Sequence, residues 1–145
     1  NDHQASVAHK YIPKAIHPST RALILSDSTY RKVKQKEVSS ATTIHSYSSA
    51  TIQDIANVVN DYHPSARAEA VIIHVGHNSI DNGTAQTTIK DQIKSLAATV
   101  IGKLKPLNIS ISKHPPVKTG RFGRTKNNTP ITAFNNSLDE IADEL

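Results

Sequence analysis

The sequence predicts a three-layer α/β/α sandwich with a parallel sheet, an arrangement of the flavodoxin-like kind. Short apolar segments rich in β-branched residues alternate along the chain with longer segments of helical period. Each stretch between two apolar segments is long enough to cross the sheet, which favours parallel pairing. Two of the apolar segments run directly into small polar residues, as buried parallel strands do where their carboxyl ends border a site.

Four segments have the length and composition of strands. The first and third are almost wholly apolar, which is typical of strands covered on both faces. The second is rich in β-branched residues and alternates imperfectly between apolar and polar ones. The predicted strands are Arg21–Ser26, Val38–Tyr47, Ala68–Val75 and Leu107–Ser112.

The segments between and after these strands carry helical signals. Apolar residues recur at spacings of three and four, and proline-containing pairs at 63–64 and 105–106 are expected to end two of the helices. A turn signal, Asp81-Asn82-Gly83, precedes the longest helix. The predicted helices are 28–35, Ser49–Tyr62, Thr84–Lys103 and Pro130–Leu145.

The length of 145 residues suits one domain with its own core. Residues 1–20 have no clear period, so we expect an N-terminal arm there and an α/β domain over residues 21–145. No apolar run reaches membrane-spanning length. The absence of cysteine excludes disulfides, thiolate catalysis and cysteine zinc sites, and the spacing of His3, His9 and His17 suits no standard metal site.

The formal net charge of +5 leaves two interpretations open. Basic residues cluster at 31–36 and 113–126, and a basic surface can attract nucleic acid. A solvated basic face is the simpler interpretation. No aromatic residues interleave with the basic ones, so the sequence does not support a platform for stacking single-stranded bases.

Three strand ends should meet at one edge of the sheet and form a site there. They bring Ser26-Asp27-Ser28, Gly76-His77-Asn78-Ser79 and Ser112-Lys113-His114 together, and the connection at Ser48-Ser49 should approach the same edge. A serine at a helix start lies near backbone N–H groups that can bind an oxyanion, and an asparagine amide can add a donor. An ordinary helix N-cap at Ser28 and an ordinary turn residue at Asp27 are the alternative.

The same segments resemble the conserved blocks of the SGNH (GDSL-type) esterase family. Leu-Ile-Leu-Ser-Asp-Ser at 23–28 is similar to the first block, Ser48-Ser49-Ala50-Thr51 to the second, and Ile73 to Ser79 to the third. Within the family, the chain is most similar to SGNH-type domains of fish genomes linked to LINE-type retrotransposons. The segments 81–96, 112–120 and 135–138 carry that likeness, which covers roughly residues 21–145.

The resemblance implies a role for several residues. Ser28 would be the nucleophile, with its own N–H in the oxyanion hole. Ser49 stands where the family has a glycine that donates its N–H, and Asn78 matches the family's oxyanion asparagine. Asp27 and Gly76 would orient the two turns. The implied reaction is hydrolysis of a small ester or lipid through an acyl-enzyme, without metal or cofactor.

The chain departs from the family pattern at three places. Ser26 replaces the glycine before Asp27, so we expect a strained turn there, and Ser79 replaces the aspartate after Asn78. The family's Asp-x-x-His block, which supplies the base and its orienting acid, should follow the last helix, and this sequence does not contain it. We therefore expect either a C-terminally truncated domain or a derived one that lacks the usual pair.

Without that block, the sequence leaves catalysis open. His77 and His114 are the candidate replacement bases, and His74 is expected to be a buried histidine of the strand. The first hypothesis is an active serine esterase; the second is a pseudoenzyme that binds nucleic acid or another copy of itself. The third is a secreted glycoprotein used as a binding module, suggested by Asn-x-Ser/Thr sequons at 82, 108, 127 and 135. A retrotransposon-like role would place the protein inside the cell, and used sequons outside it.

Overall fold

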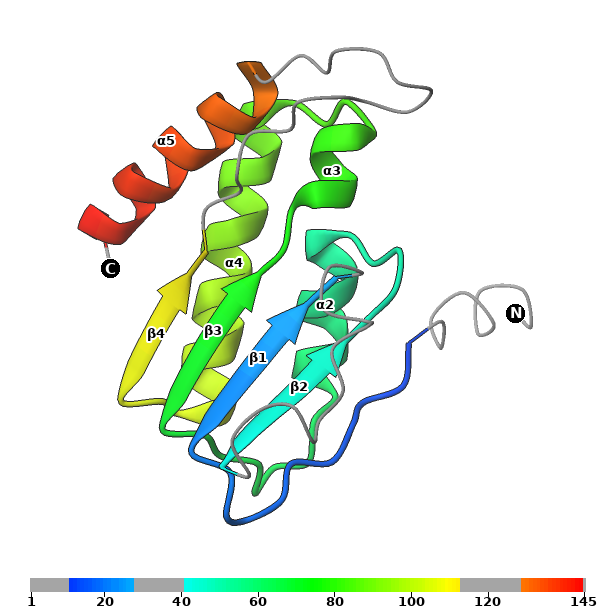
Figure 1. Ribbon diagram of the computed structural model, residues 1–145, viewed down its shortest axis with the longest axis vertical. Helices are drawn as coiled ribbons and strands as arrows, with labels where there is room; N and C mark the ends of the chain where they lie inside the picture. The colour runs from blue at the N-terminus through cyan, green and yellow to red at the C-terminus, as the bar shows by residue number, and fades with distance from the viewer. Residues whose placement is uncertain (1–10, 28–40, 113–128, 145) are drawn as a thin grey trace.

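The computed structural model describes residues 11–27, 41–112 and 129–144. Within them, four strands form one parallel sheet in the order β2-β1-β3-β4. Figure 1 shows the four arrows side by side and pointing the same way. The strands are β1 (Ala22–Ser26), β2 (Thr42–Ser46), β3 (Ala70–His74) and β4 (Asn108–Ile111).

Each predicted strand in the described residues exists, and its bounds are shorter than predicted. The helices are α2 (Ile52–Asn60), α3 (His77–Asp81), α4 (Gln86–Leu104) and α5 (Thr129–Glu144). Three of them match predictions to within a few residues, whereas α3 was not predicted. The start of the second predicted strand at Val38 and the helix predicted at 28–35 lie outside the described residues.

Helix α2 begins where its sequence satisfies the first turn. Thr51 is the N-cap, and its side chain accepts a hydrogen bond from the Asp54 N–H, while the Asp54 carboxylate accepts one from the Thr51 N–H. This reciprocal pair is a capping box, which satisfies two backbone donors that a helix start otherwise leaves open. The sequence placed this helix start at Ser49, two residues before the cap.

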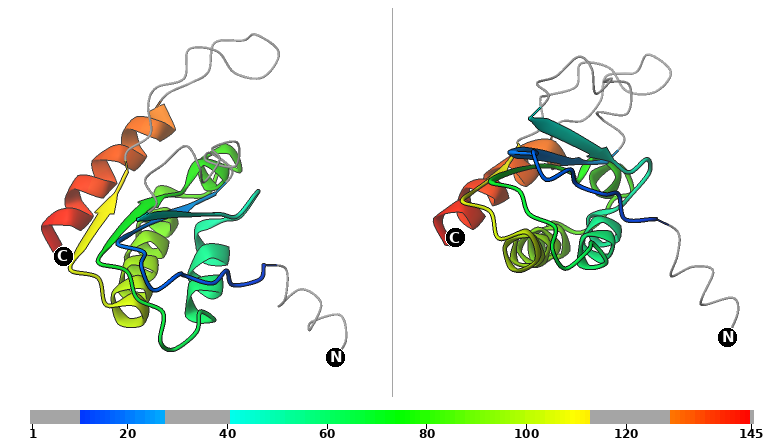
Figure 2. Two further views of the ribbon diagram at one scale, coloured as in Figure 1. Left: turned by 60° about the horizontal axis from the view of Figure 1, so that its bottom comes forward. Right: turned by 90° about the horizontal axis from the view of Figure 1, so that it is seen from below.

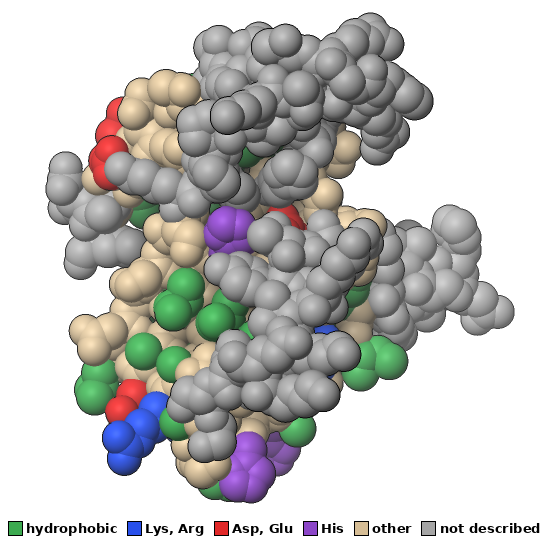
Figure 3. Space-filling model, viewed as in Figure 1, with side chains coloured by type: hydrophobic (Ala, Val, Ile, Leu, Met, Phe, Trp, Pro, Cys, Tyr) green, Lys and Arg blue, Asp and Glu red, His purple; other side chains and the backbone are tan. Residues whose placement is uncertain are grey.

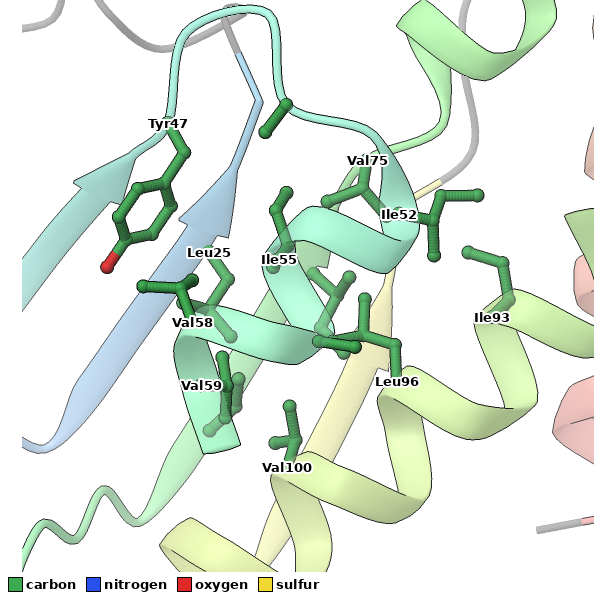
Figure 4. Close-up of a cluster of buried hydrophobic side chains, with 14 of the residues drawn as sticks. Leu25, Tyr47, Ile52, Ile55, Val58, Val59, Val75, Ile93, Leu96 and Val100 are labelled. Carbon is green, nitrogen blue, oxygen red and sulfur yellow. The ribbon is translucent and has the colours of Figure 1, made fainter. Parts of the chain in front are cut away.

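The core lies between the sheet and helices α2 and α4, which cover the same face (Figure 2). Alternate residues of β1 and β3 point into it, and Leu23, Leu25, Val71 and Ile73 are almost completely buried. Figure 4 shows side chains of α2 and α4 meeting Leu25 and Val75 from that face. The core contains mainly Ile, Val, Leu and Ala, as expected from an aromatic content of 4%. The parallel sheet and its helices confirm the predicted α/β sandwich.

The predicted N-terminal arm contacts the core through its described part, residues 11–20. Tyr11 and Ile16 pack against the core cluster, and Thr20 is buried. Hydrogen bonds fix the segment to β2 and the residues after it. They join Tyr11 Oη to Ser48 O (3.0 Å), Lys14 Nζ to Ser46 O (2.8 Å), His45 Nε2 to Ala15 O (3.3 Å) and Thr20 Oγ1 to Thr43 Oγ1 (2.8 Å).

A buried polar chain lies under this segment. Tyr62 Oη is 2.6 Å from both His45 Nδ1 and Tyr47 Oη, and His45 Nε2 faces Ala15 O. Burial lowers the pKa of His45 to about 4, although its bond to Ala15 O acts in the opposite direction, and the Lys14 charge lowers it further. Burial also raises the pKa of Tyr62 far above its usual range. The chain is therefore neutral at pH 7, with Tyr62 donating to His45 Nδ1 and His45 Nε2–H donating to Ala15 O.

This chain predicts a pH-dependent stability. Below its ordinary pKa of 6.5 His45 binds a proton in the unfolded chain, whereas in the folded chain it stays neutral down to about pH 4. Protonation therefore favours unfolding in that window, and the free energy of unfolding should fall as the pH is lowered from 6.5 to 4. Thermal unfolding followed by circular dichroism at several pH values measures this slope.

His45→Gln is the matched variant for that experiment, because its amide can still donate to Ala15 O and cannot titrate. The difference between wild-type and variant curves isolates His45 from the carboxylates that titrate in the same range. We expect the variant's midpoint to fall less steeply between pH 6.5 and 4. Parallel curves for the two proteins would contradict the assignment.

Candidate active site

The carboxyl ends of the strands lie at one edge of the sheet, as predicted. Ser26 pairs with Ser46 on one side and with His74 on the other. Ile73 pairs with Ile111, so β4 ends at the same edge. The segments that follow these strands therefore start from neighbouring positions at the upper end of the sheet in Figure 1.

The turn that leaves β1 is fixed by both neighbouring strands. Tyr47 N–H donates to Ser26 O (2.9 Å), and the Ser46 hydroxyl donates to Asp27 O (2.7 Å). From the other side, Asp27 N–H lies 3.4 Å from His74 O. The Asp27 side chain is completely buried. These contacts position the residue immediately before Ser28, which itself lies outside the described residues.

Ser26, at the position where the resemblance implies a glycine, does not have a strained backbone. Ser26 ends β1 in extended conformation and its φ is not positive, so the expected strain is absent at Ser26 itself. The part of the turn from Ser28 onward lies outside the described residues. Ser26 does add a polar atom, its Oγ, in a buried position. This atom has no hydrogen-bond partner in the part of the chain that the structure describes. A glycine at this position would avoid burying an unsatisfied hydroxyl.

Ser49 has the backbone conformation that favours glycine. Its φ is 62°, in the left-handed region, and it lies in the turn closed by the bond from Ala50 N–H to Tyr47 O (3.2 Å). The resemblance implied a glycine at this position, and the positive φ explains why a glycine suits it. The serine adopts the same conformation at an energetic cost, because its Cβ approaches the backbone.

The third segment reaches this turn through Asn78. The Asn78 Nδ2 donates a hydrogen bond to Ala50 O (3.0 Å), so the segment after β3 is joined to the residue beside Ser49. Gly76, with a φ of 103°, is the N-cap of α3 and lets the chain turn sharply out of β3. An amide nitrogen carries two hydrogens, so one remains available for another acceptor. The structure therefore brings Asn78 and Ser49 together at the predicted edge.

Other predicted residues have different placements. Ser79, at the position where the resemblance implies an aspartate, is buried, and its carbonyl accepts a bond from Thr84 N–H (3.0 Å). His74 is buried at the end of β3, as predicted. His77 is the first residue of α3, and its side chain lies outside what the structure describes, as does all of His114.

The sequence did not reveal α3 or the bond between Asn78 and Ala50. A helix of five residues is too short to show a period, and a side-chain bond across 28 residues leaves no local signal. In the described ranges, no three His, Asp or Glu side chains form a group that could bind a metal ion. None of the described helices has the length and apolarity needed to cross a bilayer.

Comparisons with solved structures define the class of fold. A member of the lipolytic G-D-S-L family from Veillonella parvula matches with a TM-score of 0.65 and 12% identity, over 86% of this chain and 73% of that one. A proposed acylhydrolase from Bacteroides fragilis matches with a TM-score of 0.65 and 13% identity, over 99% and 72%. A Streptococcus pneumonia protein, described as a proposed platelet activating factor, reaches 0.72 and 13%, over 99% and 68%.

The fold is therefore an α/β sandwich of the SGNH hydrolase type. No family model matches the sequence, and no curated protein matches it. At identities of 12–13%, the likeness to the solved structures is one of fold.

The left-handed conformation of Ser49 predicts that Ser49→Gly stabilises the protein. Glycine adopts a positive φ at little cost, whereas the same conformation destabilises other residues by roughly 1 kcal/mol. The greater flexibility of glycine in the unfolded chain offsets part of the gain from the substitution. We expect the free energy of unfolding, measured with urea, to rise by up to about 1 kcal/mol. The neighbouring Ser48, exposed and without a positive φ, supplies the control. Equal effects of Ser48→Gly and Ser49→Gly would contradict this account.

Proposed function

We propose that this chain is an SGNH-type serine hydrolase domain that cleaves small esters or lipid esters through an acyl-enzyme on Ser28. The observation that carries the proposal is the bond from Asn78 Nδ2 to Ala50 O (3.0 Å), which joins the second and third family-like segments beside Ser49. The fixed turn at Asp27 supports it, because Ser28 is the next residue. The fold shared with lipolytic proteins is the third support.

The proposed reaction follows the usual two steps of serine hydrolases. The Ser28 hydroxyl oxygen attacks the ester carbonyl carbon, its proton passes to a base, and the carbonyl oxygen becomes an oxyanion. Collapse breaks the bond to the alcohol oxygen, which leaves with the proton from the base. Water then attacks the acyl-enzyme in the same way, releasing the acid and restoring the Ser28 hydroxyl.

Asn78 and Ser49 are the proposed oxyanion donors. The second hydrogen of Asn78 Nδ2 remains when the first is given to Ala50 O, and that bond limits how the amide can rotate. The Ser49 N–H has no backbone acceptor within the described residues. Donors held in place before the reaction stabilise the oxyanion without reorganising, which is the largest contribution in many hydrolases.

Two histidines are the candidate bases for Ser28. His77 is our first candidate because it adjoins Asn78 at the start of α3, and His114 is the second. The four histidines whose side chains the structure describes are not our candidates. His45 belongs to the buried tyrosine chain, and His74 is buried within β3. His17 and His63 precede β1 and β3 at the opposite end of the sheet.

A fluorophosphonate probe tests the nucleophile. We expect wild type to be labelled and Ser28→Ala not to be, because only an activated serine hydroxyl attacks the phosphorus. Asn78→Ala should react with the probe about 10²- to 10³-fold more slowly than wild type, and it should hydrolyse p-nitrophenyl acetate more slowly by the same factor. This is the usual effect of removing one oxyanion donor. Intact-mass spectrometry reads the labelling, and circular dichroism shows whether each variant folds.

Two further variants identify the base and close the test. Either His77→Ala or His114→Ala should abolish labelling if that imidazole accepts the Ser28 proton, and the other should not. Wild type that stays unlabelled, or Ser28→Ala that is labelled equally, overturns the proposal of catalysis.

A binding module without catalysis is the second candidate, and the buried Ser79 favours it. Where the family pattern has an acidic side chain, this chain buries the Ser79 hydroxyl, and the Ser26 hydroxyl is buried without a partner among the described residues. With a net charge of +5, nucleic acid is the partner we test, by the loss of RNA or DNA affinity as salt is raised. Self-association, a link to LINE-type retrotransposons and secretion with used sequons stay predictions.

A further inference from the structure

A pocket lies at the amino end of the sheet, away from the candidate active site. Its volume is about 670 Å³, and it lies between residues 13–18, which lead into β1, and residues 63–67, which lead into β3. This volume is within the usual range for small-molecule sites. Pro13, Ile16, Pro18 and Ala66 give it apolar walls. Figure 3 shows histidine side chains gathered at this lower end of the molecule.

Two copies of one tripeptide, His-Pro-Ser, form the polar side of this pocket. His17-Pro18-Ser19 precedes β1 and His63-Pro64-Ser65 precedes β3, the strand next to it in the sheet. Both turns have the same geometry. In each, the serine N–H donates to the histidine Nδ1 (3.1 Å), the serine Oγ lies 2.7 Å from the same atom, and the histidine carbonyl closes the turn at 2.9 Å.

This geometry determines which ring nitrogen carries hydrogen. Because a backbone N–H donates to Nδ1 in both turns, Nδ1 must be the acceptor, so the neutral ring carries its hydrogen on Nε2. Neither Nε2 has a hydrogen-bond acceptor among the described residues. The pocket is thus lined by two imidazoles, each with a free N–H donor on a ring held by its own turn.

Arg67 adds a fixed guanidinium to these donors. Its Nη1 donates to the carbonyls of Pro64 (3.0 Å), Ala66 (2.7 Å) and Lys103 (3.3 Å), which hold one end of the group. The hydrogens on Nε and Nη2 have no acceptor in the described part of the chain. That edge of the guanidinium has the geometry that binds an oxyanion through two parallel hydrogen bonds.

The charge of the pocket favours an anion with more than one charge. None of the described residues that line it is acidic, while Arg67 and Lys14 are both cationic. The Lys14 ammonium is already bonded to Ser46 O and lies 5.0 Å from the Tyr47 ring centre, so it supplies charge rather than a free donor. A pocket lined by two imidazole N–H donors and a guanidinium edge offers more donors than a carboxylate has oxygens, which favours the larger oxygen set of a phosphate.

We propose that this pocket binds a small phosphomonoester, with the phosphate held by His17 Nε2–H, His63 Nε2–H and Arg67, and an apolar or aromatic body against the proline and isoleucine walls. The proposal is independent of the hydrolase proposal, since this pocket lies beside the segments that lead into β1 and β3, whereas the hydrolase proposal concerns the segments that follow these strands. Nothing in the chemistry of the pocket requires a reaction; its function is binding.

Titration of the full chain with phenyl phosphate tests this site, followed by amide chemical shifts in NMR at about 150 mM salt, which screens weak surface attraction. We expect saturable binding with the largest shifts at Ser19, Ser65 and Arg67. Inorganic phosphate and benzoate should bind at least about threefold more weakly, since one lacks the apolar body and the other lacks the second charge. The proposal is overturned if benzoate binds as tightly as phenyl phosphate, if the largest shifts lie at other residues, or if binding does not saturate. Equal binding of inorganic phosphate overturns the role of the apolar walls.

Three variants separate this site from general charge attraction. Arg67→Gln should weaken phenyl phosphate binding about 10- to 100-fold, and Arg67→Lys should also weaken it, because lysine keeps the charge and loses the paired donors. His63→Asn should keep the turn, since an asparagine oxygen can accept the Ser65 N–H, and weaken binding about 3- to 10-fold. Arg21→Gln, an exposed arginine outside the pocket, is the matched control. A loss with Arg21→Gln equal to that with Arg67→Gln overturns the proposal.

Discussion

The parallel pairing of β1 with both β2 and β3 is the constraint on which the candidate site depends. Pairing Ser26 with Ser46 and with His74 makes three strands end together, so three loops leave the sheet from adjacent positions. Parallel strands must be joined by crossovers, and these place α2 and α4 on one face, where they bury Leu25 and Ile73. Burial of these apolar side chains therefore fixes the register of β1 against its neighbours. That register in turn brings the polar residues at the strand ends to one edge of the sheet. A one-residue slip of β1 would expose Leu25 and move Asp27 out of reach of the Ser46 hydroxyl.

Much of this framework was predictable from local patterns. Composition and spacing predict the burial of the regular elements. Examples are the apolar runs at 23–25 and 71–75 and the periodic helix over 86–104. The edge of the sheet where the site lies follows from the same reasoning, because parallel strands share a carboxyl end. The bounds were less accurate, since Thr51 begins α2 through a capping box with Asp54, and such a cap overrides the propensity of Ser49 and Ala50.

What local patterns could not show are the contacts between segments distant in sequence. The Asn78 amide meets Ala50 because β2 and β3, which precede these two residues, both pair with β1. The chain of His45, Tyr62 and Tyr47 forms only when the residues after α2 meet the end of β2. The strain expected at Ser26 was wrong for a related reason. A family pattern can require glycine for either of two reasons: the backbone conformation at that position, or the space and polarity around it. At Ser49 the φ of 62° gives the first reason, and at Ser26 the buried hydroxyl points to the second.

The two ends of the sheet use the same strands for different kinds of loop. At the carboxyl end, the chain turns through positive φ at Ser49 and Gly76, and the Asn78 amide joins the two segments through its bond to Ala50 O. At the amino end, each His-Pro-Ser turn enters a strand, and its histidine satisfies a serine N–H with Nδ1 while its Nε2 stays available. Because β1 and β3 are adjacent, repeating one tripeptide before each of them brings two imidazoles to one pocket. A three-residue repeat is too short to indicate a structural repeat in the sequence. The strand order nevertheless brings its two histidines to one pocket, each with an Nε2–H donor.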